Sequence, residues 1–163
     1  MNDAREKVEA LMKFPEKDSY VGIIRLQMVR EKEHLYNGEH LNTPLKAANF
    51  IRPLFHMADR EMMVVMSLNR RMEPLAIEVA AVGGMDECCV DIRNIFKHAL
   101  LNNAGNIMCF HNHLGGSREP SIADRFLTEK IRTAGRIMGI VFADHIIIAR
   151  DGYYSFKENG ELD

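Results

Sequence analysis

The order of strand-like and helix-like segments is the feature that most constrains this fold. Two apolar runs, at 61–68 and 75–82, flank the polar stretch NRRMEP and predict a β-hairpin. After the hairpin come a segment with helical periodicity (86–101), a short apolar run (106–110) and a second helical segment (122–138). Strands that alternate with helices around one hairpin predict an α+β fold, with a mixed β-sheet flanked by helices in an α/β/α-like arrangement.

Residues that cap or break helices mark where these elements begin and end. Thr43 is a candidate N-cap, and Pro44 suits the first position of the helix that follows. Pro53 lies inside the same helical pattern and predicts a kink or an early end. Further along the chain, Ser121 is a candidate N-cap and Gly139 a candidate stop for the helix between them.

Both ends of the chain predict further elements. Residues 1–17 carry apolar side chains at helical spacing among charges, which indicates an N-terminal arm or short helix, and 18–163 is predicted to form one domain. β-Branched residues at 20–29 predict a strand. Two more strands are expected at 140–148 and 153–156, around the turn RDG.

Composition and charge exclude several classes of protein. The 163 residues carry a formal net charge of −2 at pH 7, without the basic excess that phosphate binding needs, so we expect no nucleic-acid partner. Hydrophobic residues make up 47% and charged residues 27%, values typical of a globular protein. The apolar runs are too short to span a bilayer and the N-terminus is charged, so we expect a cytoplasmic protein with no membrane partner.

The stretch HNHLGGSREPSIAD, at 111–124, gathers candidate metal ligands. Side chains two apart lie on the same side of an extended chain, so His111 and His113 can face one ion. Asp124 falls in the first turn of a helix that Ser121 caps, and three protein ligands leave a zinc position open for water. The same residues also suit an ordinary helix cap with a first-turn acid beside two polar loop histidines.

The string HxH-x7-S-x2-D in this stretch resembles the JAMM signature, also called JAB or MPN+, of zinc metallopeptidases. Together with DHIII and YSF further on, it is similar to the bacterial RadC-like JAB proteins over about residues 20 to 160. The resemblance implies a JAB/MPN architecture, similar to cytidine deaminase, for 18–163. In that family a catalytic glutamate opens a strand some fifty residues before the first histidine, and DREMMVVMSL puts Glu61 in that place.

The same resemblance implies a role for each site residue. His111, His113 and Asp124 would bind one Zn²⁺ per chain, and Glu61 would deprotonate the water that is the fourth ligand. Ser121 would donate a hydrogen bond to the oxyanion of the tetrahedral intermediate. The implied activity is hydrolysis of a peptide or isopeptide bond, with a peptide or protein as the substrate.

The sequence also departs from the family pattern. Leu114 and Gly115 replace the Pro and Ser of HNHPSG, GGMD at 83–86 replaces GTLN, and residues 92–94 replace PRE. The altered loop at Leu114 and Gly115 favours an alternative in which the fold keeps zinc but acts as a binding module without peptidase activity. A zinc nucleobase deaminase would need H-x-E and P-C-x-x-C strings, which the sequence lacks. The sequence leaves open whether the chain is a monomer or a homodimer.

Other polar and reactive residues have structural interpretations. Asp144 and His145 lie in a predicted strand, where we expect hydrogen bonds in the core or to a metal ligand. The adjacent Cys88 and Cys89, with no CxxC pair in the chain, predict reduced thiols that pack near a helix start. Cys109 is expected to be a buried packing residue.

Overall fold

The fold was analysed in a computed structural model, which describes residues 22–25, 29, 38, 40–84 and 90–162. By its internal contacts the chain divides into Met1–Glu33 and His34–Asp163. The described part of the first unit, residues 22–25 and 29, is irregular, and the predicted arm at 1–17 with its boundary lies outside the described residues. The account below therefore concerns the second unit.

The second unit is an α+β domain, as the alternation of segments predicts. Its described residues form, in chain order, α2 (Pro44–Phe55), β1 (Met62–Leu68), β2 (Pro74–Val82), α3 (Ile92–Leu101), β3 (Asn106–Asn112), α4 (Ile122–Met138), β4 (Val141–Ala149) and β5 (Gly152–Ser155). None of these helices is both long enough and apolar enough to cross a membrane.

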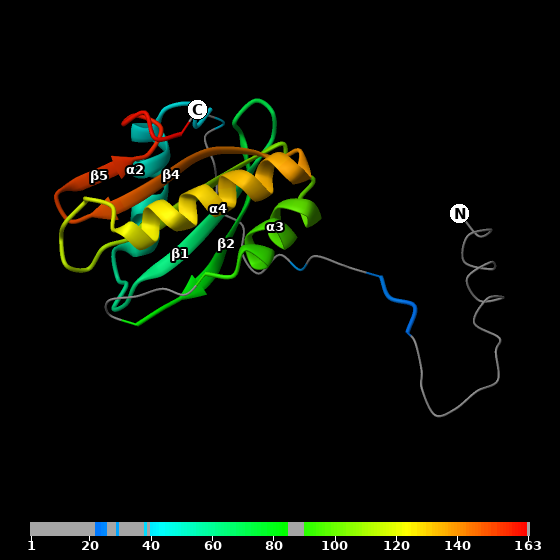
Figure 1. The fold of residues 1–163 in the computed structure, drawn as a ribbon, viewed down its shortest axis with the longest axis horizontal. Helices are drawn as coiled ribbons and strands as arrows, with labels where there is room; N and C mark the ends of the chain where they lie inside the picture. Colours follow the sequence, from blue (N-terminus) through cyan, green and yellow to red (C-terminus); the bar gives the residue numbers. More distant parts are fainter. Residues whose placement is uncertain (1–21, 26–28, 30–37, 39, 85–89, 163) are drawn as a thin grey trace. The chain divides into compact units, whose positions relative to one another are not determined.

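The five strands form one mixed sheet in the order β2-β1-β3-β4-β5. Strands β3 and β4 are parallel, while the β1–β2, β1–β3 and β4–β5 pairs are antiparallel. Helix α4 connects the two parallel strands and packs with α3 on one face of the sheet, whereas α2 covers the other face (Figure 1). The parallel pair is the βαβ unit whose strand ends commonly hold ligands in α/β proteins.

Alternation along the strands separates two hydrophobic cores. In β3, Met108 and Phe110 belong to the core under α2, and Ile107 and Cys109 belong to the core under α3 and α4. Because side chains alternate between faces, His111 continues the second series and points toward the α3–α4 side. This alternation decides which helix the first candidate ligand faces.

Most predicted elements are confirmed, and two of their boundaries differ from the prediction by two residues or more. Helix α3 begins at Ile92, not near residue 86, because Asp91 caps it by accepting a hydrogen bond from the Arg93 N–H. Strand β3 continues to Asn112, past the predicted end at residue 110, because its pairing with β1 and β4 extends to His111 and Asn112. For the predicted strand 20–29, the described residues 22–25 and 29 are not in a strand.

The predicted helix ends agree with the structure. Thr43 caps α2 and Pro44 is its first residue, while Pro53 is accommodated two residues before the helix ends. Ser121 caps α4 in a capping box, and Gly139 ends the helix with a φ of 68°, a left-handed conformation that favours glycine. The N-terminus of α4 is therefore held in place next to the end of β3.

Candidate metal centre

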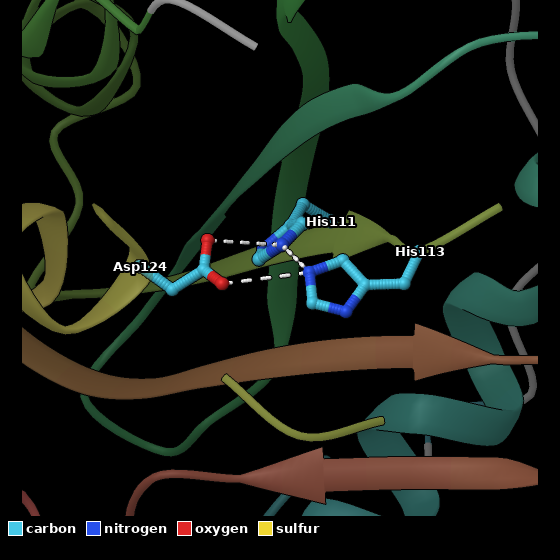
Figure 2. A group of neighbouring side chains, drawn as sticks. All are labelled: His111, His113 and Asp124. Carbon is cyan, nitrogen blue, oxygen red and sulfur yellow. Dashed lines mark hydrogen bonds and ion pairs between the residues drawn. The ribbon is translucent and has the colours of Figure 1, made fainter. Parts of the chain in front are cut away.

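Three candidate ligands converge between the end of β3 and the first turn of α4. His111 lies in β3, His113 is the first loop residue after β3, and Asp124 is the third residue of α4 (Figure 2). One nitrogen of each histidine and one carboxylate oxygen lie within 4.8 Å of one another. The structure therefore brings together the three residues that the sequence predicts as metal ligands.

The distances within this cluster are short. The Nε2 atoms of His111 and His113 are 2.7 Å apart. His111 Nε2 lies 3.2 Å from Asp124 Oδ1, and His113 Nε2 lies 3.5 Å from Asp124 Oδ2. His111 is buried and the other two side chains are mostly buried, so solvent only partly screens their interactions.

Polar partners outside the cluster orient Asp124 and His113. The Ser121 backbone N–H and hydroxyl both donate to Asp124 Oδ2, each at 2.7 Å. The ring of His113 donates from Nδ1 to the Ser117 carbonyl oxygen at 2.8 Å, because a carbonyl can only accept. These bonds leave the Nε2 of His113 and the Oδ1 of Asp124 directed at the cluster.

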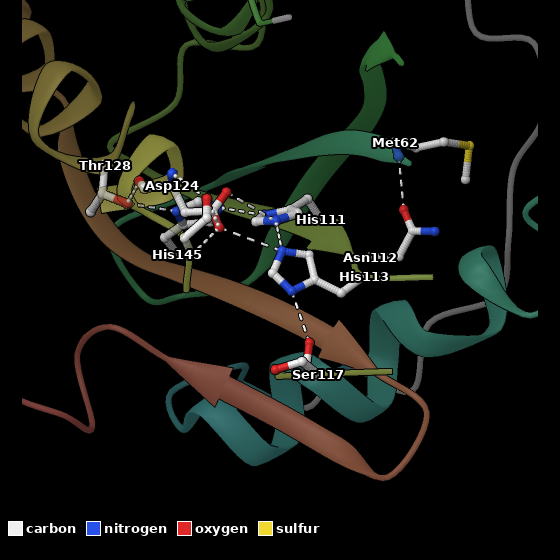
Figure 3. Close-up of polar contacts among 9 residues, drawn as sticks. Met62, His111, Asn112, His113, Ser117, Asp124, Thr128 and His145 are labelled. Atoms are coloured by element: carbon white, nitrogen blue, oxygen red, sulfur yellow. Dashed lines mark hydrogen bonds and ion pairs between the residues drawn. The ribbon is translucent and has the colours of Figure 1, made fainter. Parts of the chain in front are cut away.

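His145 and Thr128 support the ring of His111 on the side away from the cluster. The Nδ1 of His111 lies 3.0 Å from Nε2 of the fully buried His145, whose Nδ1 lies 2.7 Å from the Thr128 hydroxyl (Figure 3). His145 also stacks on Phe156, with ring centroids 4.9 Å apart and an interplanar angle of 8°. The ring of His111 is therefore fixed by both packing and hydrogen bonding.

This arrangement fits a metal ion, because electron pairs converge without enough protons to separate them. In a neutral imidazole only one nitrogen carries a proton, so the Nδ1–H of His113 leaves a lone pair on its Nε2. The Nε2 of His111 faces that atom at 2.7 Å, with the carboxylate of Asp124 beside both. A shared proton or a cation is needed between such atoms, and two imidazoles with one carboxylate form a donor set that zinc accepts.

The protonation equilibria favour metal binding at two of the three groups. The pKa of His111 falls to about 4 because burial penalises the charged ring, against the effect of the Asp124 carboxylate. The pKa of His113 is raised, first by its hydrogen bond with Asp124. Burial alone would raise the pKa of Asp124, but its interactions with His113 and His111 and the two hydrogen bonds from Ser121 hold it well below the usual range. At neutral pH the cluster thus offers a neutral His111 and an ionised Asp124, the states that bind metal, whereas a metal would have to displace a proton that His113 holds more strongly than a free imidazole does.

Glu61 lies at the edge of this site, immediately before β1. Its neighbours are anchored by Asn112, whose side chain accepts from the Met62 N–H at 2.8 Å and donates to the Arg60 carbonyl at 3.1 Å. The negative charge of Glu61 contributes to the raised pKa of His113. The half-buried Glu61 therefore lies within electrostatic reach of the predicted ligands.

A comparison with protein families identifies the domain. The family model of the RadC-like JAB domain matches residues 41–161. The chain belongs to the RadC-like JAB domain family. The match confirms the resemblance inferred from the HxH-x7-S-x2-D string. Both that string and Glu61 lie inside the matched region of this RadC-like JAB domain.

Relatives of this RadC-like JAB domain bear the name UPF0758 protein. One from Thermotoga maritima is 33% identical over 124 residues, which cover 76% of this chain and 55% of the relative. One from Listeria monocytogenes is 34% identical over 136 residues, covering 83% and 59% of the two chains. A third, from Rubrobacter xylanophilus, is 35% identical over 122 residues, covering 75% and 53%. The chain thus spans a little more than half the length of these relatives.

Sequence reasoning missed three contributors to the site of this RadC-like JAB domain. Asn112 separates the two histidines in the HNH string, yet nothing in that string indicates its bonds to the start of β1. Ser117 acts through its backbone carbonyl, which has no sequence signal. Thr128 had a usable signal, since it lies four residues after Asp124 and therefore on the same side of α4.

The other singled-out residues lie as follows. Cys109 is buried in the core under α3 and α4, and burial raises the pKa of its thiol. Asp144 accepts hydrogen bonds from the Ser155 hydroxyl and the Lys157 N–H, away from the cluster. Cys88 and Cys89 lie outside the described residues. Among the described residues that the sequence analysis singled out besides the site, His145 contacts a predicted ligand, His111.

Proposed function

We propose that this chain is a zinc-dependent peptidase that hydrolyses a peptide or isopeptide bond. The observation that carries the proposal is the convergence of two imidazole nitrogens and a carboxylate oxygen, from His111, His113 and Asp124, at the end of β3. Membership of the RadC-like JAB domain family supports it, because the matched region contains the whole metallopeptidase-like string. These three residues would hold the metal.

A zinc ion bound there would supply Lewis acidity, which polarises a carbonyl group and lowers the pKa of water. Glu61 accepts the proton of the attacking water and passes it to the leaving amine, as a general base and then a general acid. Ser121 turns its hydroxyl proton from Asp124 toward the oxygen that becomes negative in the transition state. Asn112 keeps the backbone on both sides of Glu61 attached to the end of β3.

Metal analysis and a pair of glutamate variants test this function. The purified protein is expected to hold about one zinc per chain, and His113→Ala to lose it. Glu61→Gln should keep zinc but lower the hydrolysis of internally quenched peptides, or of a lysine isopeptide, by about 100- to 10,000-fold. Glu119→Gln is the matched control, because Glu119 is an exposed carboxylate in the loop that leads to α4.

The alternative is a zinc-containing binding module without peptidase activity. The observation that favours it is Leu114, an exposed apolar side chain directly after His113. Zinc binding together with the absence of any hydrolysis that Glu61→Gln abolishes would support this alternative. Protein that takes up no zinc at neutral pH would contradict both functions.

A further inference from the structure

A β-bulge in β4 determines which side chain of that strand contacts His111 of the candidate metal centre. Strand β4 pairs in register with β3 as Ile107 with Phe142, but the next pair is Met108 with Asp144, so Ala143 is an extra residue. If residues 142–145 alternated strictly, with no bulge, Asp144 would face α4 as Phe142 does. The bulge shifts the alternation by one and turns His145 toward α4 instead.

Hydrogen-bond accounting then assigns a proton to each atom between His111 and α4. The Thr128 hydroxyl donates its only proton to the Asp124 backbone carbonyl at 2.7 Å, since a carbonyl can only accept. The Thr128 oxygen must therefore accept from the Nδ1–H of His145, also at 2.7 Å. His145 is fully buried, and its described hydrogen bonds go to Thr128 and His111 and to no carboxylate. A buried charged ring without an anionic partner is costly, so the ring is neutral.

The same accounting continues to the candidate ligand. A neutral His145 with its proton on Nδ1 has a lone pair on Nε2, which lies 3.0 Å from Nδ1 of His111. His111 must therefore carry its proton on Nδ1 and leave Nε2 unprotonated. That Nε2 is the atom that faces His113 and Asp124 in the cluster.

We propose that Thr128 and His145 form a relay that holds His111 in the one tautomer able to bind a metal through Nε2. The relay is a closed ring, because it starts at the backbone carbonyl of Asp124 and ends beside the carboxylate of the same residue. It couples the first turn of α4, the bulged strand β4 and the end of β3, so displacement of any one of them disturbs the ligand set. Thr128 and His145 are positioning residues, because neither belongs to the set of candidate ligand atoms.

Loss of the Thr128 hydroxyl should reverse the tautomers. In Thr128→Val the Nδ1–H of His145 would lack an acceptor, and a buried unpaired donor is costly. His145 would then carry its proton on Nε2 and donate it to Nδ1 of His111. The proton of His111 would move to its own Nε2, where it blocks the metal.

Nitrogen-15 NMR of the imidazole rings, recorded on the metal-free full chain at neutral pH, tests the relay directly. We expect Nδ1–H tautomers for both His111 and His145 in the unmodified protein, and Nε2–H tautomers for both in Thr128→Val. Thr128→Ser keeps a hydroxyl and should restore the original tautomers. Thr133→Val is the matched control, because Thr133 lies on the exposed face of the same helix and hydrogen-bonds only to Glu129 at 3.4 Å among the described contacts.

Zinc affinity, measured by competition with a chromophoric chelator, is the second readout and rests on the proposed function. Thr128→Val should bind zinc about 10- to 100-fold more weakly, the range found when an outer partner of a ligand is removed. Thr128→Ser and Thr133→Val should bind like the unmodified protein. A His111 or His145 Nε2–H tautomer in the unmodified protein would overturn the inference, and this measurement needs no variant to fold.

The two readouts separate failure of the relay from failure of the proposed function. An unmodified protein that shows both Nδ1–H tautomers but takes up no zinc would support the relay and contradict the zinc peptidase. A folded Thr128→Val that keeps both the tautomers and the zinc affinity of the unmodified protein would overturn the relay and leave the peptidase standing.

Discussion

Replacement of Asp144 by asparagine should stabilise the protein at neutral and higher pH. Asp144 has no exposed surface, and burial raises the pKa of its carboxyl group to about 6, against 3.8 in an exposed carboxyl. Two donors, the Ser155 hydroxyl at 2.5 Å and the Lys157 N–H at 3.0 Å, reduce this shift without abolishing it. The folded protein therefore favours the neutral acid, which an asparagine side chain imitates without the capacity to ionise.

The magnitude follows from the shift. A pKa about two units higher in the folded state than in the unfolded chain corresponds to about 3 kcal/mol. Because the folded pKa is raised, this contribution to stability is fully present below a pH of 3.8 and is lost as the pH rises through about 6. Relative to Asp144→Asn, the unmodified protein should thus lose about 3 kcal/mol of unfolding free energy between about pH 4 and pH 8.

Urea denaturation of both proteins across that pH range measures the difference. The control is Asp151→Asn, which removes an exposed carboxylate from the turn between β4 and β5. Its unfolding free energy should follow that of the unmodified protein at every pH. A difference between Asp144→Asn and the unmodified protein that stays constant with pH would refute burial as the dominant influence on Asp144.

Two further predictions concern the site edge and the packing of α4. Asn112→Ala removes both hydrogen bonds that hold the residues on either side of Glu61. Peptide hydrolysis should therefore fall, while zinc affinity measured by chelator competition stays unchanged. A parallel loss of hydrolysis and zinc affinity would contradict this prediction. Gly135→Ala should lower the free energy of unfolding by about 2 kcal/mol or more in urea, because the new Cβ would lie 2.6 Å from the backbone oxygen of Ile140. Gly115→Ala meets nothing within 4 Å and should change it by less than about 0.5 kcal/mol, and equal effects of the two substitutions would disprove the packing argument.

The predicted ligands were accessible from the sequence because their positions follow from local rules. Alternation in β3 puts His111 and His113 on one side, and the cap at Ser121 puts Asp124 in the first turn of α4. Glu61 was different, since only the family resemblance singled it out from other charges at a strand edge. Its place beside the site depends on the pairing of β1 with β3, which residues 50 apart in the chain do not reveal.

Helical periodicity, by contrast, did not decide which apolar residues of α4 are buried. Ile131 is fully buried, whereas Ile122, Phe126 and Ile137, which share the predicted apolar pattern, are 89%, 62% and 81% exposed among the described residues. The spacing predicts that a helix has an apolar face, but the sheet and α3 decide how much of that face is covered.

The sequence by itself determined the order of the elements, the caps of the helices and the three candidate ligands, because each depends on residues within a few positions of one another. Only the tertiary structure decided that His145, and not Asp144, supports His111, because the extra residue at Ala143 appears only when β4 is paired with β3. Thr128 completes the relay for the same reason, since its hydroxyl meets His145 only after α4 has packed on the bulged strand. The local sequence determines which residues are candidate ligands, whereas the pairing of β4 with β3 determines which side chain supports His111 and thereby its proposed tautomer.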